Sequence, residues 1–239
     1  MMKLDKTARF ASLLLLVPCF PKLYAQEGDV TANVRVNETP GATHTKHGSL
    51  TNVVLWLTPL DRPLPASIPK PHIRLIQKNK EFNPHLLVIP VGTSVDFPNL
   101  DPFFHNVFSL FNGRRFDLGL YEAGSHRSVS FDREGISYIF CNIHPEMGAV
   151  VVSLKSPYYA ISSADGSIIV HGVPPGRYRV QTWAEQLQPV SVNEAEQTVQ
   201  VTVKGASLGV LTFVVGVDPL AHHKNKFGKD YSTPQVPQY

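Results

Sequence analysis

The stretch ISYIFCNIHPEMGAVVVSL, residues 136–154, decides the fold and points to the chemistry. Two β-branched and aromatic runs, ISYIFC and GAVVVSL, enclose the seven residues CNIHPEM, Cys141–Met147. Runs of this composition are typical of β-strands. The loop between them holds a thiol, an imidazole and a thioether, which are all metal-binding groups. The sequence therefore predicts two strands joined by a loop of metal ligands.

Similar short apolar runs recur along most of the chain and are separated by turn signals. DVTANVRV (29–36) alternates in polarity, and TNVVLWLTPL (51–60) is β-branched and aromatic, while PVGT, REG, ADG and PPG mark turns. A short piece near SVNEAEQ (191–197) is the only helix-like one. Many short strands with such turns predict an all-β protein built of sandwiches or barrels.

The N-terminal segment has the order of a secretory signal. Basic residues in MMKLDKTAR are followed by the apolar run FASLLLLVPCF and by PKLYA, which ends on a small residue at Ala25. The apolar run is too short to span a bilayer. Cys19 follows Pro18 rather than a small residue, which argues against a lipid-anchored cysteine. We expect residues 1–25 to be removed on export, with an uncleaved anchor as the alternative.

Charge and cysteine content describe the mature chain. Segment 1–25 carries a net charge of +3, as does the whole chain, so the remainder is about neutral. The composition therefore gives no indication of a nucleic-acid partner or an anionic membrane. With no second stretch of membrane-spanning length, we expect a soluble protein in the periplasm or outside the cell. Cys141 is its only cysteine, and a lone thiol in an oxidising compartment must be buried, reactive or metal-bound.

A second histidine upstream supplies a further candidate ligand. His105 stands in FPNLDPFFHNVFSL, between an aromatic pair and a new apolar run. Two imidazoles and one thiolate in a trigonal arrangement, with a weak axial thioether, form the type-1 or blue copper site of electron-transfer proteins. In the Cys-x-x-His spacing the loop folds back, so that Cys141 and His144 face one point. Pro145 stiffens this loop by fixing its own φ.

These motifs resemble those of the cupredoxins, plastocyanin, pseudoazurin and above all amicyanin, over residues 72–154. LLVIPVGTSVDFPN, HNV and CNIHPEM are similar to the family's strand, first-ligand motif and short ligand loop. The whole pattern also resembles exported plastocyanin-like proteins labelled methylamine-utilisation proteins. The resemblance implies one type-1 copper, Asn106 as a brace near the thiolate, and partner docking near the exposed edge of His144. It implies the metal ligands His105, Cys141, His144 and Met147, and the docking candidates Phe103, Phe104 and Pro145.

Other interpretations of the cluster remain open. Each of the ligand candidates taken alone is more often an ordinary core or surface residue, and zinc also binds this donor set. A Cys–His pair can also act as nucleophile and base, but no third orienting group or oxyanion motif is evident nearby. The chain has no His-x-His pair of the kind that multicopper oxidases need, and no HExxH or GxSxG motif. These absences favour an electron carrier over an enzyme.

A second β module is predicted after the copper segment. PYYAISSADGSIIVHGVPPGRYRVQTWAE (157–185) resembles the carboxypeptidase regulatory, transthyretin-like sandwich in its ADG and VPPG turns. The V-x-V and VVLWL runs expected at the start of that family lie before the copper segment. We therefore expect residues 27–62 and 157–217 to form one sandwich with a cupredoxin, 70–155, inserted; a sequential order is the alternative. Residues 218–239 are expected to be an extended tail.

Two functional hypotheses follow from these observations. The first is a single-electron carrier that exchanges electrons with an unidentified redox partner protein. The second is a protein that stores or delivers copper, or one that binds a partner or glycan and uses the metal structurally, with no redox role.

Overall fold

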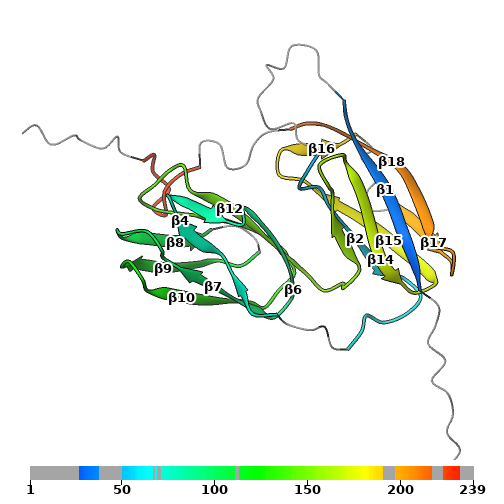
Figure 1. Ribbon diagram of the computed structural model, residues 1–239, viewed down its shortest axis with the longest axis horizontal. Coiled ribbons are helices and arrows are strands. Elements are labelled where there is room, and N and C mark those ends of the chain that lie inside the picture. Colours follow the sequence, from blue (N-terminus) through cyan, green and yellow to red (C-terminus); the bar gives the residue numbers. More distant parts are fainter. Residues whose placement is uncertain are drawn as a thin grey trace, which may run out of the picture.

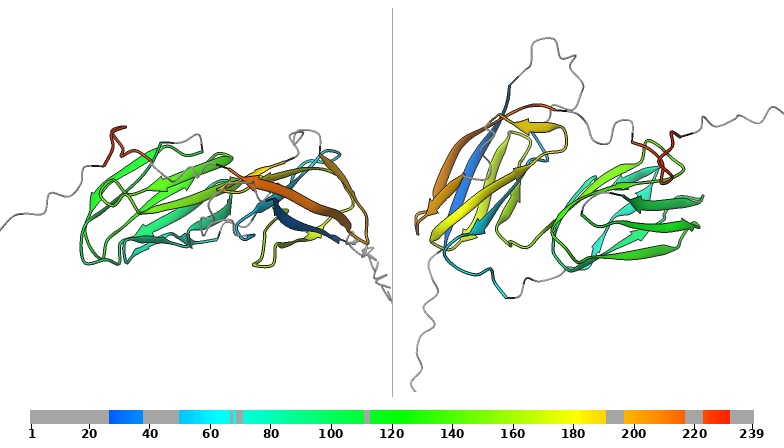
Figure 2. Two further views of the ribbon diagram at one scale, coloured as in Figure 1. Left: turned by 90° about the horizontal axis from the view of Figure 1, so that it is seen from above. Right: turned by 180° about the vertical axis from the view of Figure 1, so that it is seen from behind.

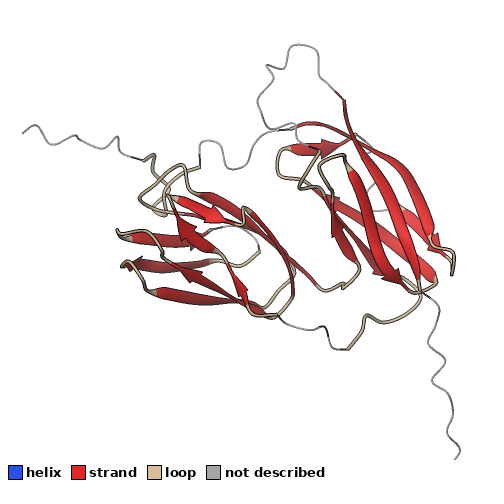
Figure 3. Ribbon diagram, in the orientation of Figure 1, coloured by secondary structure: helices blue, strands red, loops and turns tan. Residues whose placement is uncertain are grey.

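The computed structural model describes residues 27–37, 50–66, 68, 71–110, 113–190, 197–216 and 223–231. Within these ranges every regular element is a strand (Figure 3), and the predicted all-β class is confirmed. No helix of the described chain has the length and apolarity needed to cross a membrane. The predicted export signal and nearly all of the predicted helical piece, 191–197, lie outside the described residues.

The strands build two β-sandwiches that lie side by side (Figure 1 and Figure 2). The first sandwich contains the predicted metal ligands. One of its sheets has the strand order β10-β7-β3 and the other β6-β12-β11-β8-β9, with a small β4-β5 hairpin. Its strands are β3 (Ile73–Arg74), β4 (Ile76–Lys78), β5 (Glu81–Asn83), β6 (Leu86–Pro90), β7 (Thr93–Pro98), β8 (His105–Ser109), β9 (Phe116–Tyr121), β10 (His126–Phe131), β11 (Gly135–Phe140) and β12 (Gly148–Leu154).

The second sandwich combines strands from both sides of the first in sequence. Its sheets have the orders β14-β1-β18-β16 and β13-β2-β15-β17. Strand β2 pairs with both β13 and β15, so that Leu55 lies opposite Ala160 and Thr182. Its strands are β1 (Gly28–Asn37), β2 (Val54–Pro59), β13 (Tyr159–Ile161), β14 (Ser167–Val173), β15 (Gly176–Trp183), β16 (Leu187–Pro189), β17 (Thr198–Val201) and β18 (Ala206–Val215).

Hydrophobic patterns explain which faces of the strands are buried. In β1 the alternation of DVTANVRV puts Val30, Ala32 and Val34 into the core of the second sandwich. In β12 the run AVVVSL is buried on both faces. Val151 faces the core of the first sandwich, whereas Val152 belongs to a third cluster where the two sandwiches meet.

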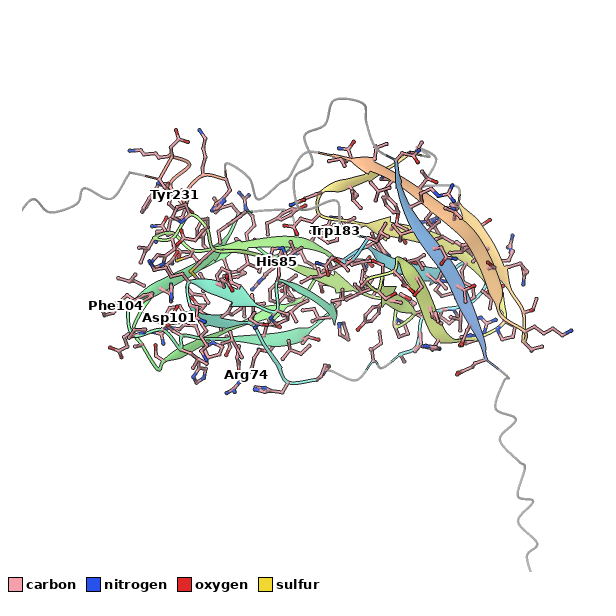
Figure 4. All side chains as sticks on the ribbon, turned by 45° about the horizontal axis from the view of Figure 1, so that its top comes forward. Arg74, His85, Asp101, Phe104, Trp183 and Tyr231 are labelled. Carbon is pink, nitrogen blue, oxygen red and sulfur yellow. The ribbon has the colours of Figure 1, made fainter. Side chains whose placement is uncertain are left out.

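That third cluster joins the two sandwiches. Its buried members are Val54 of the second sandwich and three residues of β12, with Trp183 among the side chains packed against it. The rings of Tyr138 and Trp183 lie 6.5 Å apart, and His85 Nε2 lies 2.7 Å from the carboxylate of Glu185. Figure 4 shows His85 and Trp183 at this junction. The site-bearing sandwich is therefore packed against its neighbour through an apolar contact.

The C-terminal stretch that the sequence predicts as an extended tail is described at residues 223–231. There it forms a short turn that contacts the first sandwich rather than the second (Figure 1, red). The hydroxyl of Tyr231 donates a hydrogen bond to the carbonyl oxygen of Cys141, at 2.8 Å.

Candidate metal centre

Two neighbouring strands and one loop position the candidate ligands. Cys141 directly follows β11, which pairs with β8, and His105 is the first residue of β8. The ligand loop, Cys141–Met147, closes on itself through two backbone hydrogen bonds. The Cys141 N–H donates to the Met147 carbonyl at 3.3 Å, and the Met147 N–H donates to the His144 carbonyl at 3.1 Å. Pairing and loop closure together aim the three side chains at one point.

The structure brings His105, Cys141 and His144 together. The Sγ atom of Cys141 lies 3.7 Å from Nδ1 of His105 and 3.6 Å from Nδ1 of His144. The ligand atoms all lie within 4.8 Å of one another, and this is the only such group of potential metal-binding side chains in the described part of the chain. His105 and Cys141 are fully buried, whereas His144 is half-buried. One imidazole edge therefore reaches the surface.

The separations fit a single shared metal ion. A metal about 2.3 Å from a thiolate sulfur and about 2.0–2.1 Å from an imidazole nitrogen places these atoms roughly 3.6–3.8 Å apart for angles between tetrahedral and trigonal. Both sulfur–nitrogen distances, 3.7 and 3.6 Å, lie in that interval. The donor set of one thiol and two imidazoles suits copper or zinc. The two sulfur–nitrogen separations therefore fit an ion shared by Cys141 and the two histidines.

A buried carboxylate orients His105. The Nε2 atom of His105 donates to Oδ2 of Asp101 at 2.8 Å, and Asp101 is 5% exposed. This bond leaves the Nδ1 lone pair directed at the thiol, as metal-binding histidines require. The carboxylate is held in turn by the backbone N–H groups of Asn79 and Lys80 at 2.6 and 2.9 Å. This role of Asp101 was not predicted, and its only signal in the sequence is a position four residues before His105.

The surroundings of Cys141 favour its thiolate form. Burial raises the pKa of Cys141, but the hydrogen bond with His105 and backbone N–H groups, that of Asn106 foremost, lower it below the usual value. Burial lowers the pKa of His105, but its contacts with Cys141 and Asp101 outweigh burial and raise this pKa above the usual value. Burial and the neighbouring His105 lower the pKa of His144. A thiolate, the form that binds metal, is thus stabilised in the metal-free protein.

The remaining predicted site residues lie around this centre. Met147, the last residue of the ligand loop, is fully buried in the same core cluster as Cys141. Asn106 directs its backbone N–H to the thiol, while its side-chain amide donates to Asp117 Oδ1 at 2.7 Å and to the Gly119 carbonyl at 2.9 Å. Asn106 therefore ties β8 to β9.

An exposed apolar rim surrounds the accessible histidine. The ring of Phe103 lies 5.5 Å from that of His144 and 5.2 Å from that of His105. Phe104 and Ile143 are 51% and 44% exposed, and Pro145 is exposed as well. Apolar side chains therefore contribute to the outer edge of the centre, where the Lys80 ammonium also lies 5.8 Å over the Phe103 ring. Ile143 was not among the residues predicted for this edge.

Comparison with known proteins finds likenesses only among solved structures. No protein-family model matches the chain, and no curated protein matches it. A purple cupredoxin from Nitrosopumilus maritimus is 26% identical, over 34% of this chain and 99% of that one, with a TM-score of 0.31. An oxidized amicyanin mutant is 21% identical, over 37% of this chain and 88% of that one, with a TM-score of 0.33.

A copper-containing nitrite reductase from Thermus scotoductus SA-01 is also 21% identical, with a TM-score of 0.34. The match covers 50% of this chain and only 28% of that enzyme. These neighbours are cupredoxins or contain copper. Because all three TM-scores are below 0.5, the functional interpretation rests on the geometry of the ligands in this chain.

Proposed function

We propose that the chain is an exported type-1 copper protein that carries single electrons. The observation that supports this proposal most strongly is the convergence of the buried Cys141 thiol with two imidazoles, at 3.6 and 3.7 Å, from the ligand loop and the start of β8. His105, Cys141 and His144 would hold the ion, and Met147, buried in the same core cluster as Cys141, would supply a weak thioether ligand. Copper, when bound, would supply the Cu(I)/Cu(II) couple.

The protein's own part is to keep these ligands fixed while the electron moves. Asp101 holds the ring of His105, and the backbone N–H of Asn106 stabilises the thiolate. The closed loop and the packed core limit movement of Cys141. Ligands that stay in place in both redox states reduce the reorganisation that accompanies electron transfer. We propose no substrate chemistry at this site, and so an electron carrier rather than an enzyme.

The redox partner would dock on the apolar rim. Phe103, Phe104 and Ile143 expose apolar surface around the half-buried His144, and exposed apolar patches with a polar surround are typical of protein contact sites. His144 would be the residue through which the electron leaves. The partner is another periplasmic or secreted protein, as the export signal in the sequence implies.

We propose a scaffold role for the second sandwich. Its strands before and after the copper sandwich, represented by β2 and β15, pair in one sheet, which supports an insertion of residues 70–155 between 27–62 and 157–217. The order of strands and turns supports the carboxypeptidase regulatory, transthyretin-like type. The apolar junction with β12 supports a role in holding the copper sandwich.

The decisive experiment is to load the purified mature chain with Cu(II). An intense blue, green or purple colour that a mild reductant bleaches and an oxidant restores supports electron transfer. Cys141→Ser should abolish the colour, whereas Met147→Leu should keep copper and raise the redox potential. A colourless Cu(II) complex contradicts the proposal and favours storage, delivery or a structural metal.

A further inference from the structure

The C-terminal segment 223–231, called here the strap, contacts the candidate metal centre although it follows the last strand of the other sandwich (Figure 1, red). In Figure 4, Tyr231 lies over the end of the first sandwich that also carries Asp101 and Phe104. The phenol of Tyr231 donates to the Cys141 carbonyl at 2.8 Å, and the His223 ring stacks on Phe140 with centroids 4.0 Å apart.

Two further contacts come from a single lysine of the strap. The backbone N–H of Lys226 donates to the side-chain oxygen of Asn142, at 3.0 Å, within the ligand loop. Its ammonium lies 2.8 Å from Oδ2 of Asp117. The other oxygen of Asp117 accepts from Asn106, the neighbour of His105. The strap therefore contacts the ligand loop directly, and it is linked to β8 through Asp117, which also binds Asn106.

The strap is internally ordered, so its contacts act as a unit. Its turn is closed by Asn225, which donates to the Lys229 carbonyl and accepts from Gly228, both at 2.9 Å. His223 Nε2 lies 3.1 Å from the hydroxyl of Tyr231, which joins the two ends of the strap. A turn closed in this way loses less conformational freedom on docking than an extended tail would.

We propose that the strap is a working part of the metal centre and that Tyr231 is its positioning residue. By binding the carbonyl of Cys141, Tyr231 fixes the backbone of the residue that supplies the thiolate. The contacts of the strap with Phe140 and Asn142 hold the residues before and after Cys141. This inference rests on the proposed function only for its copper readouts. The restraint on the Cys141 thiol exists in the metal-free protein as well.

The test compares Tyr231→Phe with a matched control, Tyr178→Phe. The hydroxyl of Tyr178 also donates to a backbone carbonyl, that of Pro174 at 2.7 Å, but it lies in the second sandwich. Tyr178→Phe loses the hydrogen bond to Pro174, whereas Tyr231→Phe loses the one to Cys141 and the contact with His223 Nε2. Both variants keep the ring. A third variant that ends at Gly216 removes the strap altogether.

The first readout is the rate at which the Cys141 thiol of the metal-free mature chain reacts with an aromatic disulfide reagent. The loss of the hydrogen bond to the Cys141 carbonyl should speed this reaction by about five-fold in Tyr231→Phe, which corresponds to about 1 kcal/mol. Truncation should speed it further, and Tyr178→Phe should leave it unchanged. Equal rates in the parent chain, Tyr231→Phe and the truncated chain would overturn the proposal.

The second readout uses the copper-loaded protein. Tyr231→Phe should release copper to a chelator several-fold faster and shift the thiolate-to-copper absorption maximum, and the control should do neither. An unchanged maximum in Tyr231→Phe and in the truncated chain overturns the positioning role. If copper gives no colour in any variant but the thiol rates differ as expected, the strap is supported and the proposed electron-transfer function is contradicted.

Discussion

Replacing Asp101 by asparagine tests how far copper binding depends on a residue that touches no metal. The carboxylate accepts three hydrogen bonds, from His105 Nε2 at 2.8 Å and from the N–H groups of Asn79 and Lys80 at 2.6 and 2.9 Å. An asparagine keeps the shape but has one acceptor oxygen, so its NH₂ group must face a donor. Loss of such a carboxylate behind a metal-binding histidine typically costs 10–100-fold in affinity. We expect a loss of about 1.4–2.8 kcal/mol of copper binding free energy.

The assay is a competition titration of copper between the protein and a chelator of known affinity. The matched control is Asp96→Asn, because Asp96 also faces a histidine, His72 at 3.0 Å, whose side chain is 73% exposed. The control should bind copper as the parent chain does. Unchanged copper affinity in a folded Asp101→Asn protein, or an equal loss in the control, would refute the reasoning.

Three further predictions concern stability. Burial raises the pKa of Asp101, but hydrogen bonds, that from Lys80 foremost, outweigh it and lower the pKa below 3.8. The charged carboxylate therefore stabilises the metal-free fold above that pH. Urea unfolding at stepped pH should show this stabilisation disappear as the pH falls through the lowered pKa, and Asp101→Asn should not show this loss. Leu154→Ala, at the sandwich junction, should lower the unfolding free energy by about 2–5 kcal/mol in urea, and a loss near zero would contradict a packed junction. Removing copper by chelation should lower the melting temperature of the parent chain, because a ligand that binds only the folded state stabilises it; Cys141→Ser should show little of this difference.

The elements that the sequence predicts well are those whose signal is local. The alternation of DVTANVRV indicates β1 because side chains of a strand point to opposite faces in turn. The signal of the ligand loop is also local, since Cys141, His144 and Met147 lie in one seven-residue loop between β11 and β12. His105 could be added because its motif stands at the start of another apolar run.

Contacts between distant parts of the chain could not be predicted in the same way. The apolar run of β12 indicates burial on both faces but not that the second sandwich covers one of them. In the sequence Asp101 is one acidic residue among many. Only in the folded chain does the loop before β8 bring its carboxylate within 2.8 Å of His105 Nε2. Tyr231 stands in a polar stretch without periodicity, and only the folded chain brings it to the carbonyl of Cys141.

The most direct test of the central claim is X-ray absorption at the copper edge of the loaded mature chain, compared with Cys141→Ser. If His105, Cys141 and His144 share one ion, the parent spectrum requires one short copper–sulfur distance and two imidazole nitrogens. In the variant the short sulfur shell should disappear. A parent spectrum explained by nitrogen and oxygen neighbours alone would contradict the claim.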